Sequence, residues 1–153
     1  MKQIKFLTFL LVALSFIALS SCSNDENEVQ DARIQYVGTW NSISTGSVTL
    51  FQNGQSIGTI PRNESSTVSI SKSGTNALII DGTSYIVNGT NLSSNPTPVN
   101  VNSDGVNIVG TALSNGTLSS NIISLNDAIT GTWNETNGAS GNLSGSVITT
   151  LTR

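Results

Sequence analysis

From Arg33 to the C-terminus, short runs rich in β-branched residues alternate with turn signals, and this pattern limits the possible folds more than any other feature. No window has the i, i+3, i+4, i+7 apolar spacing of an amphipathic helix. Residues 66–71 (Ser-Thr-Val-Ser-Ile-Ser) instead place Val68 and Ile70 on one face of an extended strand. The region 33–153 is therefore predicted to be an all-β domain.

Two hairpins are predicted from their turn residues. Asn53-Gly54 lies between the runs 47–52 and 55–60, and Asp81-Gly82 lies between 76–80 and 84–87. Both pairs tolerate the positive φ angles of a type I′ turn, which joins antiparallel strands tightly. Pro61 is expected to end the ladder after residue 60, because proline cannot donate a backbone hydrogen bond.

The rest of the domain is predicted to continue as short strands. They are expected at residues 34–44, 66–71, 99–101, 106–113, 117–125, 129–135 and 143–151. Turns are expected at Lys72-Ser73-Gly74, Ser103-Asp104-Gly105, Ser114-Asn115-Gly116 and 137–141, and the proline-containing stretch 88–98 is expected to be irregular. The runs 77–80 and 85–87 are apolar on both faces, so we expect them in the middle of the core.

This gives an antiparallel meander of about nine or ten short strands. An up-and-down barrel is the simplest closure, because a closed sheet has no exposed edges. A two-sheet β-sandwich is the alternative.

Charge and aromatic content limit the function. From Arg33 onward there are five acidic and four basic residues, so the domain is nearly neutral and has no basic patch for nucleic acid. After residue 21 the aromatic residues are Tyr36, Trp40, Phe51, Tyr85 and Trp133. The core must therefore consist mainly of Val, Ile and Leu.

The first 21 residues have the pattern of an export signal. Lys2 and Lys5 precede an apolar run at 6–18, and small residues follow it. The next residue, Cys22, is the single cysteine of the chain, so an exported form has no internal disulfide. Residues 22–32 are polar and acidic and are expected to form a flexible tether.

Leu19-Ser20-Ser21-Cys22 resembles the bacterial lipobox. The resemblance implies cleavage before Cys22, lipidation of its sulfur, and attachment to a membrane by acyl chains such as palmitate. An ordinary secretory signal is the alternative. The acidic run after Cys22 resembles the surface-export signal of Bacteroidetes lipoproteins, which implies an outer-membrane protein displayed at the cell surface. A plain tether facing the periplasm is the alternative.

Gly38-Thr39-Trp40 resembles the Gly-x-Trp motif that opens lipocalins and related calycin barrels. The resemblance implies that Trp40 packs across a closed barrel end, under a cation for which Arg153 is the candidate. Small lipocalin-like lipoproteins of Bacteroidetes are closer in character. Gly131-Thr132-Trp133-Asn134 repeats Gly38-Thr39-Trp40-Asn41, and a Gly-Ser-Val follows each copy, at Gly46 and Gly145.

Catalytic chemistry is not indicated. The chain has no histidine, and lipidation would occupy the Cys22 sulfur. Asp81, Asp104 and Asp127 fall in or beside predicted turns, and no Asp-x-Asp-x-Asp run suggests a calcium site. We therefore expect no enzyme, no cofactor and no metal.

The sequence leaves three functions open. The first is a lipid-anchored envelope lipoprotein whose β-domain is a non-catalytic binding or structural module, with Trp40, Tyr85 and Trp133 as candidate contacts to an apolar or sugar ligand. The second is a carrier of a small apolar ligand, which requires a cavity lined by Trp40 and Tyr85. The third is an accessory subunit of an outer-membrane complex, which an exposed apolar patch would favour.

Overall fold

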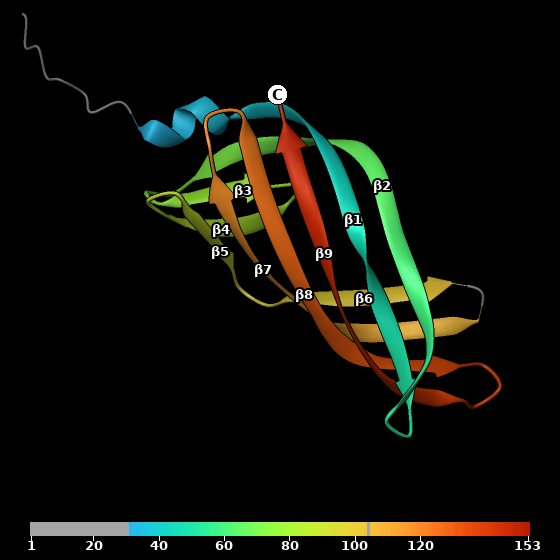
Figure 1. The fold of residues 1–153 in the computed structure, drawn as a ribbon. Coiled ribbons are helices and arrows are strands. Elements are labelled where there is room, and N and C mark those ends of the chain that lie inside the picture. Colours follow the sequence, from blue (N-terminus) through green and yellow to red (C-terminus); the bar gives the residue numbers. More distant parts are fainter. Residues whose placement is uncertain (1–30, 104) are drawn as a thin grey trace, which may run out of the picture. The chain divides into compact units, whose positions relative to one another are not determined.

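The β-domain is one continuous antiparallel sheet of nine strands, preceded by a short 3₁₀ helix. The computed structural model describes residues 31–103 and 105–153. The elements are η1 (Ala32–Tyr36), β1 (Gly38–Gln52), β2 (Gln55–Ser73), β3 (Ala77–Ile80), β4 (Thr83–Asn88), β5 (Asn91–Ser94), β6 (Thr97–Ser103), β7 (Val106–Leu118), β8 (Ile122–Glu135) and β9 (Ser140–Thr152) (Figure 1). The predicted all-β meander is confirmed, and a single sheet replaces the alternative sandwich.

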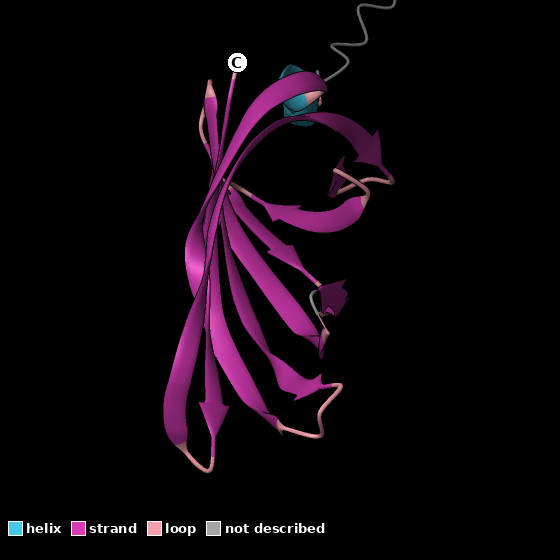
Figure 2. Ribbon diagram, turned by 90° about the vertical axis from the view of Figure 1, so that its right-hand side faces the viewer, coloured by secondary structure: helices cyan, strands magenta, loops and turns pink. Residues whose placement is uncertain are grey.

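The sheet closes into a ring at one end only. Its order is β5-β4-β3-β2-β1-β9-β8-β7-β6, and β5 also pairs with the C-terminal part of β7, through Asn91↔Thr117 and Leu92↔Gly116. β3 pairs with β2 only over Ile70–Ser73, at the closed end. Toward the other end, β2 therefore has no neighbour on its outer side. Figure 2 shows the strands curling round at the end where η1 lies and extending away from it as hairpins.

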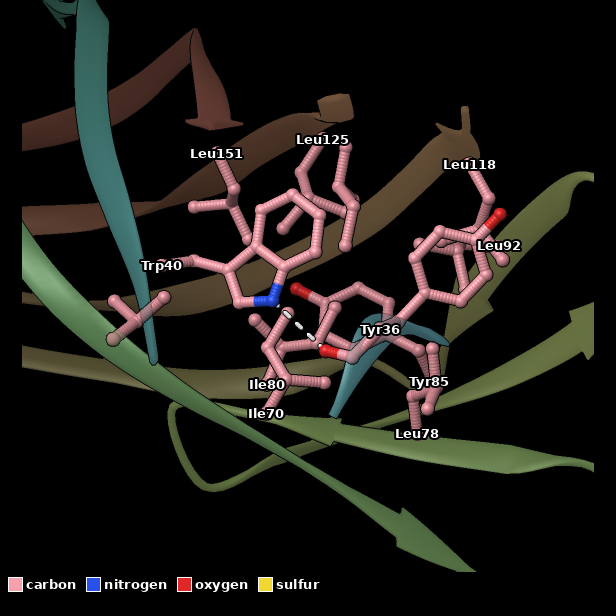
Figure 3. Packing of buried hydrophobic residues seen from close by; sticks show 12 residues of the cluster. Tyr36, Trp40, Ile70, Leu78, Ile80, Tyr85, Leu92, Leu118, Leu125 and Leu151 are labelled. Atoms are coloured by element: carbon pink, nitrogen blue, oxygen red, sulfur yellow. Dashed lines mark hydrogen bonds between the residues drawn. The ribbon is translucent and has the colours of Figure 1, made fainter. Parts of the chain in front are cut away.

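The core fills the closed end. Its largest fully buried side chains are Trp40, Leu78, Ile123 and Leu151, and they come from β1, β3, β8 and β9. Figure 3 shows these elements converging around Trp40, with Tyr36 of η1 packed over them. We call this cluster the closed-end core; its members are Tyr36, Trp40, Val68, Ile70, Leu78, Ile80, Tyr85, Leu92, Leu118, Ile123, Leu125 and Leu151.

Glycines on the inner face let the long strands coil tightly. Gly110 and Gly131 are direct partners on β7 and β8, and a Cβ on either would overlap a carbonyl oxygen of the other strand. Gly46 on β1 and Gly145 on β9 are not direct partners, but a Cβ on either would likewise overlap a carbonyl oxygen of the other strand. Such close approach of neighbouring backbones is how glycine introduces curvature into a sheet.

The predicted tight turns are confirmed. Asn53 and Gly54 have φ angles of 52° and 79°, and Asp81 and Gly82 have 48° and 81°. These are the positive values that a type I′ hairpin requires at both central positions.

The strands are longer than predicted, because the breaks expected within β1, β2, β7 and β8 are absent. Pro61 does not end the ladder but pairs with Ser47 inside the 19-residue strand β2. A proline is tolerated there because β2 is an edge strand at this level. Likewise Ser114-Asn115-Gly116 is not a turn but part of β7, where Gly116 allows the backbone of β8 to approach.

Three other boundaries were also wrong. Residues 34–36 belong to η1 rather than to the first strand, and the stretch expected to be irregular contains β5 and the start of β6. Residues 117–125 do not form one strand, since β7 ends at Leu118 and β8 begins at Ile122. Short polar β5 completes the ring, and its pairing partner, not its own composition, determines its conformation.

The runs expected in the middle of the core face it on one side only. Leu78, Ile80 and Tyr85 are buried, but Ile79 is half-buried and Ile86 is 47% exposed on the outer face. A single-layer ring has only one inner face, so a run that is apolar on both faces cannot be buried on both.

Candidate functional site

Trp40 and Arg153 seal the closed end from outside. The Trp40 indole N–H donates to the Tyr36 carbonyl oxygen at 2.8 Å, and the Arg153 guanidinium carbon lies 5.0 Å from the centre of the Trp40 ring. Arg153 also donates to the carbonyl oxygens of Gln35 and Val37. The predicted covering of Trp40 by Arg153 is therefore confirmed, and the closed end is not an entrance.

Arg33 fixes η1 to the turn between β2 and β3. Its guanidinium donates to the carbonyl oxygens of Ser73, Gly74 and Ala77 at 3.3, 3.2 and 2.9 Å. These carbonyls lie around one turn, so one side chain satisfies several backbone acceptors. Together with Tyr36, this contact holds the 3₁₀ helix over the end of the ring.

A polar hollow of about 290 Å³ opens beneath the closed-end core, and we call it the polar chamber. Its hydroxyl-bearing side chains are Ser42, Ser44, Ser66, Thr83, Tyr85 and Thr149, and its charged ones are Arg62, Glu64, Asp81 and Asp127. Arg62 Nη2 and Glu64 Oε2 form an ion pair at 2.7 Å, in which both side chains are more than half exposed. Inward positions of a small closed sheet are normally filled by apolar side chains. A polar lining here therefore marks the chamber as a candidate binding site.

One wall of the chamber is held by a hydrogen-bond network across four strands. The Ser114 hydroxyl donates to the Asp127 carboxylate, and the Ser114 backbone N–H donates to Ser94 Oγ at 3.2 Å. Burial raises the pKa of the Tyr85 phenol; a hydrogen bond with Ser114 opposes this rise, and the nearby Asp127 carboxylate adds to it. Tyr85 thus presents a neutral hydroxyl to the chamber at neutral pH.

An apolar hollow of about 200 Å³ continues the concave face into the open half, and we call it the apolar trough. Its apolar side chains are Val48, Ile60, Pro61, Val99, Val101, Ile108, Ile129, Leu143 and Val147. Arg62 and Glu64 line both the trough and the chamber, so the two hollows adjoin there. Ile60 on β2 and Val101 on β6 remain 42% and 47% exposed, although both belong to the concave lining.

The three aromatic candidates do not form one site. Trp40 and Tyr85 both lie in the closed-end core, which they fill with Ile80 and the partly buried Val87. Trp133 is 2% exposed on β8, and its indole N–H donates to the Phe51 carbonyl oxygen at 3.2 Å. Of the three, only Tyr85 borders the polar chamber.

The tryptophans of the two repeated motifs lie in different parts of the domain. Trp40 packs at the closed end, whereas Trp133 packs in the open half beside a shallow outer depression of about 430 Å³ that also includes Asn107 and Asn142. The two Gly-Ser-Val segments pair with each other, through Gly46↔Val147, Ser47↔Ser146 and Val48↔Gly145. The repeat therefore serves close packing of β1 against β9.

Sequence reasoning missed Ser42, Ser44, Ser114 and Asp127 as a group. Asp127 was placed beside a turn, but it lies in the middle of β8. The missed signal was the alternation from Trp40, because residues 40, 42 and 44 share one face of a strand and change there from apolar to polar.

Residues 31–103 and 105–153 lack two features that would point to metal binding or to a helical membrane span. They contain no group of three or more acidic, histidine or cysteine side chains arranged to hold a metal ion. They also contain no helix of the length and apolarity needed to cross a membrane. Cys22, the predicted lipidation site, the signal segment 1–21 and most of the tether lie outside the described residues.

Comparisons with protein-family models, with curated proteins and with solved structures find no match to this chain. Its function is therefore argued from its own residues.

Proposed function

We propose that the chain is a lipid-anchored protein of a bacterial cell envelope and that its β-domain is a non-catalytic binding module. The observation that supports a binding role is the concave face of the open half, where the polar chamber and the apolar trough meet at Arg62 and Glu64. Ligand sites are typically concave, with apolar walls and a few polar groups that orient the ligand. The absence of histidine from the sequence supports a role without catalysis.

We further infer that the domain is a lipocalin-like barrel that is closed at one end. Trp40 stacked under Arg153 supports this, since that pairing is what the resemblance at Gly38-Thr39-Trp40 implied. The ligand position differs from the expected cavity between Trp40 and Tyr85, because side chains fill that space. Binding is therefore assigned to the open half.

Attachment is assigned to Cys22 and to the outer membrane. The lipobox-like Leu19-Ser20-Ser21-Cys22 and the preceding signal segment support lipidation, and the acidic residues after Cys22 support display at the cell surface. A diacylglycerol with a further acyl chain would hold the protein stably at a bilayer, where one chain would not.

Replacing Cys22 tests the anchor. We expect Cys22→Ala to abolish acyl modification and to move the protein out of the membrane fraction, as measured by intact-protein mass spectrometry and fractionation. Cys22→Ser is the matched control for the loss of the sulfur alone and should behave identically. An unmodified sulfur in the native protein would contradict the proposal. In a separate experiment, protease digestion of intact cells distinguishes surface display from a periplasmic position.

A second candidate function is docking on an outer-membrane protein. Ile43 on β1 and Ile148 on β9 are 53% and 50% exposed on the outer face, and the pairing Thr45↔Ile148 makes them diagonal neighbours. Neighbouring exposed apolar side chains favour a protein contact. Crosslinking from position 148 in intact cells tests this role, and it fails if no envelope protein is captured there.

A further inference from the structure

Along the interior of the β-domain, the inward side chains change from apolar to polar and then back to apolar. On β1 the inward side chains run from Trp40 through Ser42 and Ser44 to Val48, and on β8 they run from Leu125 through Asp127 to Ile129. Packing alone would favour apolar side chains at every inward position, because buried polar groups lower stability unless they are satisfied. In the described residues no buried side-chain nitrogen or oxygen lacks a hydrogen-bond partner, so the polar layer is compatible with folding. A ligand that has both a polar and an apolar part would match this change along the interior.

The trough fits a hydrocarbon chain. Apart from Arg62 and Glu64 at its junction with the chamber, its lining is apolar, and Ile60 and Val101 keep nearly half of their surface in water. A flexible chain that covers these side chains would gain hydrophobic free energy without needing any polar partner.

A partner β-strand fits the trough less well. The free edge of β2 carries Pro61 at this level, followed by the inward charges Arg62 and Glu64. Prolines and inward-pointing charges are features by which proteins block pairing at a sheet edge. The other free edge, β6, carries Pro98. Both edges therefore disfavour an added strand, including one from a second copy of this chain.

The chamber fits an uncharged, hydroxyl-rich group. Three carboxylates and one guanidinium line it, so a negatively charged group would be repelled. The same charges would attract an ammonium group, but that group only donates hydrogen bonds and would leave the Arg62 donors and the hydroxyl donors of the lining without an acceptor. Sugar-like hydroxyls can use both kinds of partner.

We propose that the concave face binds one single-chain amphiphile, with its hydrocarbon chain in the apolar trough and an uncharged, hydroxyl-rich head in the polar chamber. This inference rests on the binding role proposed above and specifies the ligand class for the same site. Arg62 and Glu64 lie where the head joins the chain.

Native mass spectrometry tests this on the full processed protein. The protein is released from dodecyl maltoside micelles to which an equal amount of either dodecylammonium or laurate is added in separate runs; the three amphiphiles carry alkyl chains of similar length. We expect one dodecyl maltoside to stay bound per chain, with roughly tenfold less of either charged amphiphile, a difference of about 1.4 kcal/mol.

Matched isoleucine variants locate the bound chain. Ile60→Asp in the trough should reduce maltoside retention about tenfold or more, whereas Ile148→Asp on the outer face should leave it unchanged. Asp127→Asn should reduce the discrimination against laurate, because it removes one negative charge from the chamber. Near-ultraviolet circular dichroism of the tryptophans checks the fold, and Val101→Asp replaces Ile60→Asp if that variant loses the signal.

Equal retention of the three amphiphiles would overturn the inference. So would retention that survives both trough substitutions, or a dimer in place of the bound amphiphile. Membrane attachment through Cys22 is scored from the lipid mass on the same protein. Loss of amphiphile retention with that mass intact therefore rejects the ligand and leaves the anchor standing.

Discussion

At the scale of single residues, one guanidinium organises each side of the closed end. Arg33 satisfies the carbonyls of the β2–β3 turn, and Arg153 covers Trp40 while it donates to the carbonyls of Gln35 and Val37. Both residues join parts of the chain that are distant in sequence. The role of Arg153 could be predicted from a family resemblance, but that of Arg33 could not, because no local pattern indicates which carbonyls a side chain will meet.

Replacing Arg153 should loosen the closed end. We expect Arg153→Met to lower the free energy of unfolding by about 1–2 kcal/mol, through loss of the cation–π contact and of two hydrogen bonds. Chemical denaturation followed by tryptophan fluorescence measures the change. Arg62→Met is the control, because an exposed ion pair contributes little, and its effect should stay below about 0.5 kcal/mol. Equal effects of the two substitutions would contradict the assigned role.

At the scale of strands, the sequence predicts the turns well and the strand ends poorly. Asn53-Gly54 and Asp81-Gly82 require positive φ, so their chemistry is local and readable. Pro61 was expected to end a strand and Asn115-Gly116 to lie in a turn, yet both lie inside strands. Tertiary structure overrides these local signals. β2 is an unpaired edge at Pro61, and Gly116 allows a close approach of the neighbouring backbone.

The inner-face glycines allow a direct test of how the strands coil. Gly131→Ala should destabilise the domain by about 1–3 kcal/mol, because the new Cβ would overlap the Val109 carbonyl oxygen and push β7 away from β8. Gly58→Ala on β2 is the matched control, since open space surrounds its Cβ position, and it should be neutral or slightly stabilising. Thermal unfolding of both variants measures the difference. A neutral Gly131→Ala would show that coiling does not depend on this contact.

At the scale of the whole domain, the two halves have different roles. In the closed half, the inward apolar side chains pack together in a buried core. In the open half, the concave face leaves Ile60 and Val101 about half exposed. The all-β meander could be predicted from periodicity. The one-sided closure could not, because it depends on the pairing of short, polar β5 with β7. The chamber depends on the same closure, which is why its residues were not predicted as a group.

Thiol labelling of variants that each carry one added cysteine, in the full processed protein, tests this division and the anchor with it. We expect Val101→Cys in the trough to react at the rate of an exposed thiol and to be protected by dodecyl maltoside. Val68→Cys in the closed-end core should react roughly a hundredfold more slowly, since it is exposed only when the core opens. The unsubstituted chain should not react at all, because lipid occupies the Cys22 sulfur. Similar rates at positions 68 and 101, no protection by maltoside, or a reactive Cys22 would contradict the account.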